Sequence, residues 1–418
     1  MKNQIITGFN NIVKSRSIGI YLMAFVIPFL SDMLGICIAV IIVEQLIRNP
    51  KIDKNHFLAQ LSFKNPGIWL LLFYLMHVVG LWQTENMGFA NLDLGMKATL
   101  GILPVFYLFY KAKIDWNYFI HCFIIGALIS FFINLILSLY SYILGDRFIY
   151  LFTNENLSHF MHRGYWAVYL SIAYFFLLKI LKSGVEEKYL KKYIIASVLI
   201  ALAIVLSGSK VGMIFVFVLT LWGSSILMKT FDRKKTIKTI SILVLSVFLV
   251  LQLFVPRIFD RVSDSFKTVL QPIENYDVNN PSSTAARIMV WDSSIDLIKE
   301  RFWLGFGTGD VKDQLIQKNY DNGYIAVADK KLNSHNQFFN SHIALGVLGS
   351  LFLLLTLLTS FIKKAEDPFW SWRCGIILML FFALLPESML ETQAGIIPYA
   401  FLLSILPSFK AVDYTSKL

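Results

Sequence analysis

The sequence predicts an all-α integral membrane protein with about twelve transmembrane helices and one large, partly helical loop on the outer side. Of its 418 residues, 56% are hydrophobic and only 16% are charged, and the mean hydropathy is +0.62. One water-soluble core cannot enclose that much apolar surface. The apolar residues also form long blocks rather than amphipathic stripes, and lysine and arginine gather in alternate connections between the blocks.

Each apolar block is long enough to cross, or nearly cross, a bilayer as one helix. A second block closely follows the first, so we expect the N-terminus to be retained and not removed as a signal peptide. The first two blocks are short and the fifth is long. In chain order, the twelve blocks lie at residues 17–31, 33–47, 66–82, 92–110, 117–144, 163–181, 192–208, 211–228, 239–255, 343–362, 374–387 and 393–408.

The positive charges predict the orientation. With the N-terminus in the cytoplasm, the cytoplasmic connections hold 24 of the 38 Lys and Arg residues. The short outer connections hold only Arg147, Arg163 and Lys210. Because basic connections resist translocation, this asymmetry predicts an even number of spans and two cytoplasmic termini. Most of the net charge of +11 is then topological, and we expect no nucleic-acid partner.

One outer connection is far longer than the rest. Residues 256–336 carry ten basic and eleven acidic residues, and a structureless loop of that length would be unusual. An amphipathic helix is predicted by the helical spacing of Thr284, Arg287, Trp291, Ile295 and Ile298. Ser282 or Ser283 is available as its N-cap. The predicted organisation is residues 1–255 with helices one to nine, a loop domain at 256–342 carrying Arg287 and His335, and residues 343–418 with the last three helices and a cytoplasmic tail.

Three groups of polar residues are predicted at the outer ends of these spans. The turn Ser207-Gly208-Ser209-Lys210 places a lysine at the outer boundary, either snorkelling to water or holding a lipid-linked phosphate. Arg287 lies on the loop helix and is either a solvated side chain or a second phosphate ligand. His162 and Arg163 begin the sixth span and repeat the cationic pattern.

Histidine chemistry is suggested by the run Asn333-Ser334-His335-Asn336-Gln337, directly before the tenth span. His335 is either a capping residue or a general base that takes a proton from a sugar hydroxyl. Asn336 and Gln337 would orient it or bind a sugar. Glu387 and Glu391 occupy the last outer turn, as polar turn residues or as counter-ions to a basic site.

The run Gly305-Phe306-Gly307-Thr308-Gly309-Asp310 superficially resembles a dinucleotide fingerprint, but no strand precedes it, so turns with positive φ at glycine are the better interpretation. The outer connections contain no DxD-like acidic pair, Walker loop, GxSxG elbow or Cys nucleophile with a partnering His. The cysteines, Cys37, Cys122 and Cys374, lie within apolar blocks and predict neither a disulfide framework nor a zinc site. We therefore expect no metal and no cofactor, with Lys and Arg stabilising a phosphate leaving group.

The order and spacing of these motifs resemble the O-antigen ligase and O-antigen polymerase superfamily of membrane glycosyltransferases. The resemblance covers most of the chain. It is carried by residues 206–210, 286–291, 305–310, 332–337 and 345–349, with further similarity at 92–97, Leu103-Pro104, 162–166 and the turn containing Glu387, Glu391 and Gln393.

The resemblance implies a bacterial inner-membrane enzyme whose cavity faces the periplasm and opens to the membrane lipids. There a glycan on undecaprenyl diphosphate would pass, with inversion, to an acceptor hydroxyl. Arg287 would carry over as a catalytic, diphosphate-binding residue and His335 as the base or acceptor-orienting residue. Lys210 stands where many members have Arg, which keeps the charge and loses the bidentate fork. Arg163 would be an additional diphosphate contact, and Asn336, Gln337, His162 and Glu387 candidate glycan or acceptor contacts.

Three enzymes and one transporter remain as alternatives. A ligase using lipid A core as acceptor is the first choice, and a polymerase extending lipid-linked glycan is the second. A protein O-glycosylating enzyme is disfavoured because no large periplasmic domain follows the last span. A transporter of lipid-linked glycans is disfavoured because the cations gather at one membrane face and no inverted repeat is evident.

Overall fold

The computed structural model is all-helical in the part of the chain that it describes, residues 17–48, 51–52, 54–111, 114–145, 157–230, 257–363, 367 and 369–408. Six of its helical segments are long and apolar enough to cross a membrane. These are Pro66–Gln83, Met87–Phe109, Trp116–Ile143 (α8), Arg163–Ser183 (α10), Glu187–Leu206 (α11) and Gln337–Ser360 (α18). The predicted all-α fold is therefore confirmed for the described residues, and the six candidate spans support a membrane protein.

The remaining apolar helices are not among these six segments. The first two predicted spans correspond to α2 (Ile18–Val26) and α3 (Leu34–Arg48), and α2 has only nine residues. The eighth, eleventh and twelfth correspond to α12 (Lys210–Thr230), α19 (Trp370–Ala383) and α20 (Gln393–Ile405). The ninth predicted span, residues 239–255, lies outside the described residues. The total of twelve spans therefore stays a prediction.

Three predicted boundaries change. The third span is α5 (Pro66–Val79) with a short 3-10 turn, Gly80–Gln83. The fourth consists of two helices, α6 (Met87–Lys97) and α7 (Thr99–Phe109). The tenth, α18, begins at Gln337 rather than near residue 343, because the Asn336 side chain caps it by accepting hydrogen bonds from the Phe338 and Phe339 amides.

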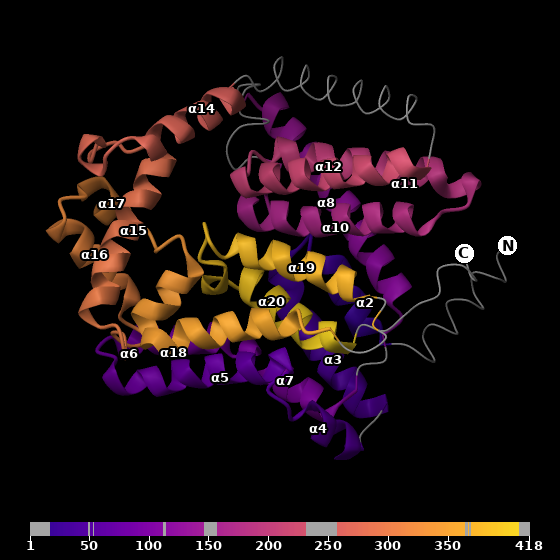
Figure 1. Cartoon of the computed structure of the whole chain (residues 1–418), viewed down its shortest axis with the longest axis horizontal. Helices are drawn as coiled ribbons and strands as arrows, with labels where there is room; N and C mark the ends of the chain where they lie inside the picture. The colour runs from indigo at the N-terminus through magenta and orange to yellow at the C-terminus, as the bar shows by residue number, and fades with distance from the viewer. Residues whose placement is uncertain are drawn as a thin grey trace.

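The helices pack as groups that meet around α20 and α19 (Figure 1). α18 lies along α5, which also packs against α7; α10 packs against α8, α11, α12 and α19; and α2 packs against α8. A short helix, α4 (Lys54–Gln60), contacts α7. The core between these helices is aromatic and aliphatic, with Trp116, Trp166, Tyr169 and Tyr399 fully buried. This close packing makes a fixed frame for the connections at either end.

The long connection is helical, as predicted, and gathers at one end of the bundle (Figure 1). It contains α14 (Arg257–Leu270), α15 (Ser283–Glu300), α16 (Val311–Asp321) and α17 (Ile325–Asp329). Ser282 caps α15 by accepting a 3.2 Å hydrogen bond from the Ala285 amide, which confirms one of the two predicted caps. α15 packs against α16 and α18, so the loop helices are joined directly to the bundle.

The glycine run closes a break in α18. Gly346 has φ 64° and interrupts the helix, which leaves nearby carbonyl groups without helical partners. The Phe306 and Gly307 amides donate to the carbonyls of Ile343 and Ala344 at 2.8 and 2.9 Å. Gly305 and Gly307 have φ 70° and 111°, so the interpretation of this run as glycine turns is confirmed. The helix break itself was not predicted.

Candidate functional site

A cavity of about 510 Å³ lies where the loop helices meet the ends of the membrane helices. Its walls come from the start of α10, the turn between α11 and α12, the facing sides of α14 and α15, and the turn between α19 and α20. Five residues singled out from the sequence line it: His162, Arg163, Lys210, Arg287 and Glu387. The fold thus brings together side chains that are separated by up to 225 positions in the chain.

Glu387 joins Arg287 to His335. Its Oε1 atom accepts a hydrogen bond from Arg287 Nη2, and its Oε2 atom lies 3.2 Å from His335 Nδ1. The three side chains are 24%, 22% and 15% exposed for Arg287, His335 and Glu387, so each is shielded from bulk water yet reachable. This carboxylate holds the histidine through one ring nitrogen and orients the arginine beside the cavity.

The backbone holds His335 in an uncommon conformation. Its φ is 44°, in the left-handed region that a residue with a side chain rarely adopts. Its amide donates to Asn333 Oδ1 at 3.0 Å, and its carbonyl accepts from Trp291 Nε1 at 3.4 Å. Together with Glu387, these contacts fix the ring. Strained residues of this kind persist where surrounding contacts over-determine them, and they are frequent at functional sites.

Another cation, Lys210, approaches the cavity from the start of α12. Lys210 is the first residue of α12, after Gly208 turns the chain with φ 63°. Its ammonium donates to the Thr284 hydroxyl at 2.7 Å and to the Ser283 hydroxyl at 3.3 Å. These hydroxyl groups belong to the first turn of α15, the helix that carries Arg287. Lys210 and Arg287 therefore face one cavity from two helices.

The remaining predicted site residues on α10 and at the start of α18 have largely structural contacts. His162 caps α10, where its Nδ1 accepts from the Gly164 amide at 3.3 Å, and Arg163 begins that helix. Asn336 caps α18. Gln337 is 1% exposed, and its side chain is engaged with the turn between α19 and α20. Of the predicted glycan contacts, only His162 and Glu387 line the cavity.

The charge balance favours an ionised Glu387. Burial alone would raise the pKa of this carboxyl group, but the hydrogen bond from His335 and the charges of Arg287, His335 and His162 hold the pKa below its ordinary value. Glu387 is therefore an anion at neutral pH and acts as the counter-ion of the cationic cavity. The sequence allowed two roles for Glu387, a polar turn residue or a counter-ion to a basic site, and these contacts favour the second.

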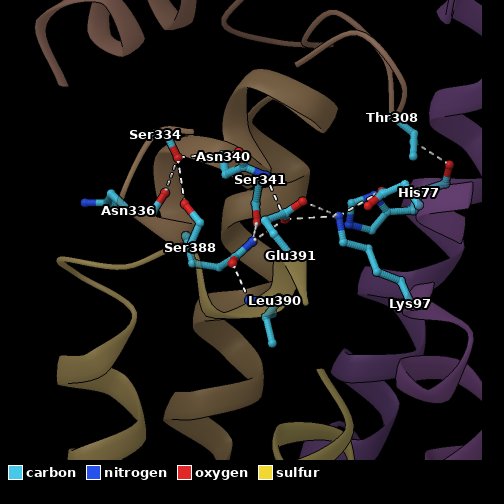
Figure 2. Close-up of polar contacts among 12 residues, drawn as sticks. His77, Lys97, Thr308, Ser334, Asn336, Asn340, Ser341, Ser388, Leu390 and Glu391 are labelled. Carbon is cyan, nitrogen blue, oxygen red and sulfur yellow. Dashed lines mark hydrogen bonds and ion pairs between the residues drawn. The ribbon is translucent and has the colours of Figure 1, made fainter. Parts of the chain in front are cut away.

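A second polar cluster lies deeper and was missed (Figure 2). Lys97 on α6 is buried; its ammonium is 2.8 Å from Asp93 Oδ2 and 3.1 Å from Glu391 Oε1. Glu391 also accepts from Asn340 Nδ2 at 2.7 Å and from Gln337 Nε2 at 3.2 Å. A signal was present in the sequence: an Asp and a Lys four residues apart within an apolar span mark a buried ion pair.

The end of the glycine run fastens the loop domain to the bundle. Thr308 donates to the carbonyl of His77 at 2.6 Å. The two carboxylate oxygens of Asp310 accept from the amides of Glu85 and Asn86, directly before α6, at 2.8 and 2.7 Å. Thr308 and Asp310 are 2% and 4% exposed. This conspicuous motif therefore has a structural position away from the cavity.

These features define a class: a polytopic helical membrane protein with a cationic cavity at one end of its bundle, lined in part by loop helices. Residues 195–354 match the protein-family model described as O-antigen ligase. This match supports the resemblance to the O-antigen ligase superfamily that the motifs indicate. The matched residues include Lys210, Arg287 and His335. No curated protein matches the chain. The family consists typically of glycosyltransferase-like ligases and polymerases, which supports an enzymatic function in general.

Proposed function

We propose that the protein is an O-antigen ligase that moves a glycan from undecaprenyl diphosphate to a hydroxyl group of lipid A core at the periplasmic face. The observation that carries this proposal is the contact of one carboxylate, Glu387, with both Arg287 and His335 beside a cavity that Lys210 and Arg163 also line. Such a site combines cations for a diphosphate with a histidine for a hydroxyl group.

The cations would bind the donor. Lys210 and Arg163 reach the cavity from neighbouring helices, and Arg287 lines it from α15. The Arg287 side chain is 24% exposed and donates to Glu387 through Nη2, so its guanidinium can donate further hydrogen bonds to a phosphate oxygen. Charge-assisted hydrogen bonds from these groups would stabilise the negative charge that develops on the departing diphosphate, without a metal ion.

His335 would act as the base. Because Nδ1 faces Glu387, the neutral ring carries its proton on Nδ1 and leaves Nε2 to accept one. The acceptor oxygen attacks the anomeric carbon as its proton passes to Nε2. The bond from that carbon to the diphosphate oxygen breaks, its electron pair leaves with undecaprenyl diphosphate, and the configuration inverts. Glu387 stabilises the imidazolium that forms.

The orientation belongs to the same proposal. We place twelve spans in the bacterial inner membrane, with both termini in the cytoplasm and α14–α17 in the periplasm. The cations singled out for chemistry then lie on the side where few basic residues are expected. Cysteines introduced at positions 320 and 185 test this arrangement. A membrane-impermeant thiol reagent added from the periplasm should label 320 and not 185, and the reverse result would overturn it.

The decisive experiment uses purified protein in proteoliposomes with one defined glycan on undecaprenyl diphosphate. Lipid A core is added in one arm and further donor alone in the other. A ligase transfers the glycan to lipid A core, whereas a polymerase makes longer glycan that remains on the polyprenyl carrier. Activity should survive a chelator such as EDTA; a loss restored by Mg²⁺ would contradict the metal-independent step.

A further inference from the structure

The turn between α19 and α20 carries two carboxylates that face different partners. Glu387 faces the cavity and contacts Arg287 and His335. Glu391, four residues later, turns to the buried side and meets Lys97 (Figure 2). In the proposed mechanism Glu387 stabilises the imidazolium of His335, whereas Glu391 takes no part in the reaction.

The network around Glu391 ties this turn to the segment that carries His335. The Leu390 amide donates to Gln337 Oε1 at 2.7 Å, and the Gln337 amide donates to the Leu384 carbonyl at 2.9 Å. Closer to the cavity, the hydroxyl groups of Ser334 and Ser388 are 3.0 Å apart. One set of hydrogen bonds thus joins the two segments that carry His335 and Glu387, as Figure 2 shows in part.

The donors around Glu391 explain why a carboxylate is present. Lys97, Asn340 and Gln337 all donate to it. A carboxylate offers acceptor sites alone and can satisfy all three, whereas a glutamine would direct an NH₂ group at one of these donors. Lys97 lies on α6, whereas Gln337 and Asn340 lie on α18, so Glu391 joins both helices to the turn.

We propose that Glu391 is a positioning residue: anchored by Lys97, it fixes the turn so that Glu387 meets His335 and Arg287 at the distances required for transfer. The inference rests on the proposed function. Its consequence is specific, because loosening the turn should lower kcat through the His335–Glu387 contact while Lys210 and Arg163 continue to bind the donor.

The test is a double-mutant cycle in the proteoliposome assay. Glu391→Gln keeps the neutral Asp93–Lys97 pair, so the protein should fold, and kcat should fall by about 10- to 100-fold, the effect expected when a reacting group is displaced by about an ångström. The donor KM should stay within about twofold. Because both variants disrupt one contact, Glu391→Gln/Glu387→Gln should be no slower than Glu387→Gln alone.

A matched control is Asp367→Asn, which breaks another buried ion pair, with Arg373, at the far end of α18 and α19. It should leave kcat unchanged. If it lowers kcat as much as Glu391→Gln does, or if the effects of Glu391→Gln and Glu387→Gln multiply, the positioning role is wrong. If Glu391→Gln does not fold, Asn340→Ala removes the 2.7 Å bond to Glu391 and should show a smaller loss with the same non-additivity.

The proposed function fails separately from this inference. If Glu387→Gln and His335→Ala themselves leave transfer unchanged, the catalytic assignment is wrong. If those variants are inactive while Glu391→Gln transfers glycan at the wild-type rate, the site stands and only the positioning role of Glu391 falls.

Discussion

The cavity cluster and the buried cluster are made of the same kinds of side chain, yet they use them differently. Lys97 is 2% exposed in its side chain and meets two carboxylates. Arg287 is 24% exposed, meets one carboxylate and lines the cavity. Breaking a fully buried ion pair destabilises a fold, whereas a partly exposed charge that lines a cavity can bind a ligand. Substitutions in the cavity cluster should therefore mainly lower transfer activity, whereas substitutions in the buried cluster should mainly lower stability.

The largest effect is expected at His335. His335→Ala removes the proposed base, and kcat for glycan transfer should fall by about 10²- to 10⁴-fold. The thermal unfolding midpoint in detergent should change little, because the side chain is partly exposed and its neighbour Glu387 keeps Arg287. The control is His159→Ala, a histidine whose ring lies beside Ser138 and not beside Glu387. Wild-type turnover by His335→Ala in proteoliposomes would remove the histidine from the mechanism.

The buried cluster should respond in the opposite way. Lys97→Met leaves the carboxylate of Asp93 buried without its cation, and breaking a buried ion pair in this manner costs about 3–5 kcal/mol. A large fall in the unfolding midpoint is expected, whereas Arg287→Met should lose transfer activity with a much smaller fall. The comparison is measured on the two purified variants by thermal denaturation in one detergent. Equal midpoints would erase the distinction between the clusters.

The sequence predicted the cavity cluster better than the buried cluster. Lys210, Arg287 and His335 stood out because polar side chains at the ends of apolar blocks are conspicuous, and the family motifs fixed their order. Lys97 stayed hidden within an apolar block, although its spacing from Asp93 was readable. Its bond to Glu391, 294 positions away, depends on how α6 packs against the last turn, and periodicity within one segment carries no such information.

The glycine run and the helix starts show the same limit. Positive φ at Gly305 and Gly307 was predicted from local chemistry. The reason for it, a break at Gly346 whose freed carbonyls need amide donors, lies in another helix. The start of α18 was placed too late because polar residues at its first turn, Gln337 and Asn340, satisfy Glu391 instead of water. A hydropathy pattern detects only the apolar part of a helix. The first turn of α18 is polar although it is buried, so the pattern does not include it.

A smaller effect is expected at Lys210. Lys210→Met removes a cation from the cavity wall and should raise the donor KM by about 10-fold, since a hydrogen bond to a charged group contributes about 1.5–3 kcal/mol. Lys210→Arg keeps the charge and should restore most of the affinity. Lys299→Met is the control, because that lysine is 71% exposed on α15 away from the cavity. An unchanged KM in Lys210→Met would mean that the lysine serves only its hydroxyl partners.

The smallest effect is the pH dependence of the contacts of Glu387. Its pKa is lower in the folded protein than the ordinary value of 4.5, so the folded state binds fewer protons there than the unfolded chain. Its ion pairs therefore contribute stability in full above pH 4.5, and that contribution disappears as the pH falls through the lowered folded pKa.

The measurement is the difference in unfolding midpoint between the wild type and Glu387→Gln across that range. At neutral pH the wild type should be the more stable by about 1 kcal/mol, the size expected of a partly exposed ion pair. As the medium becomes more acidic than pH 4.5, Glu387 protonates and loses its attraction to Arg287, His335 and His162, so the two proteins should converge. A gap that widens in acid would mean that burial dominates and that Glu387 is held neutral, in which case it cannot stabilise the imidazolium of His335.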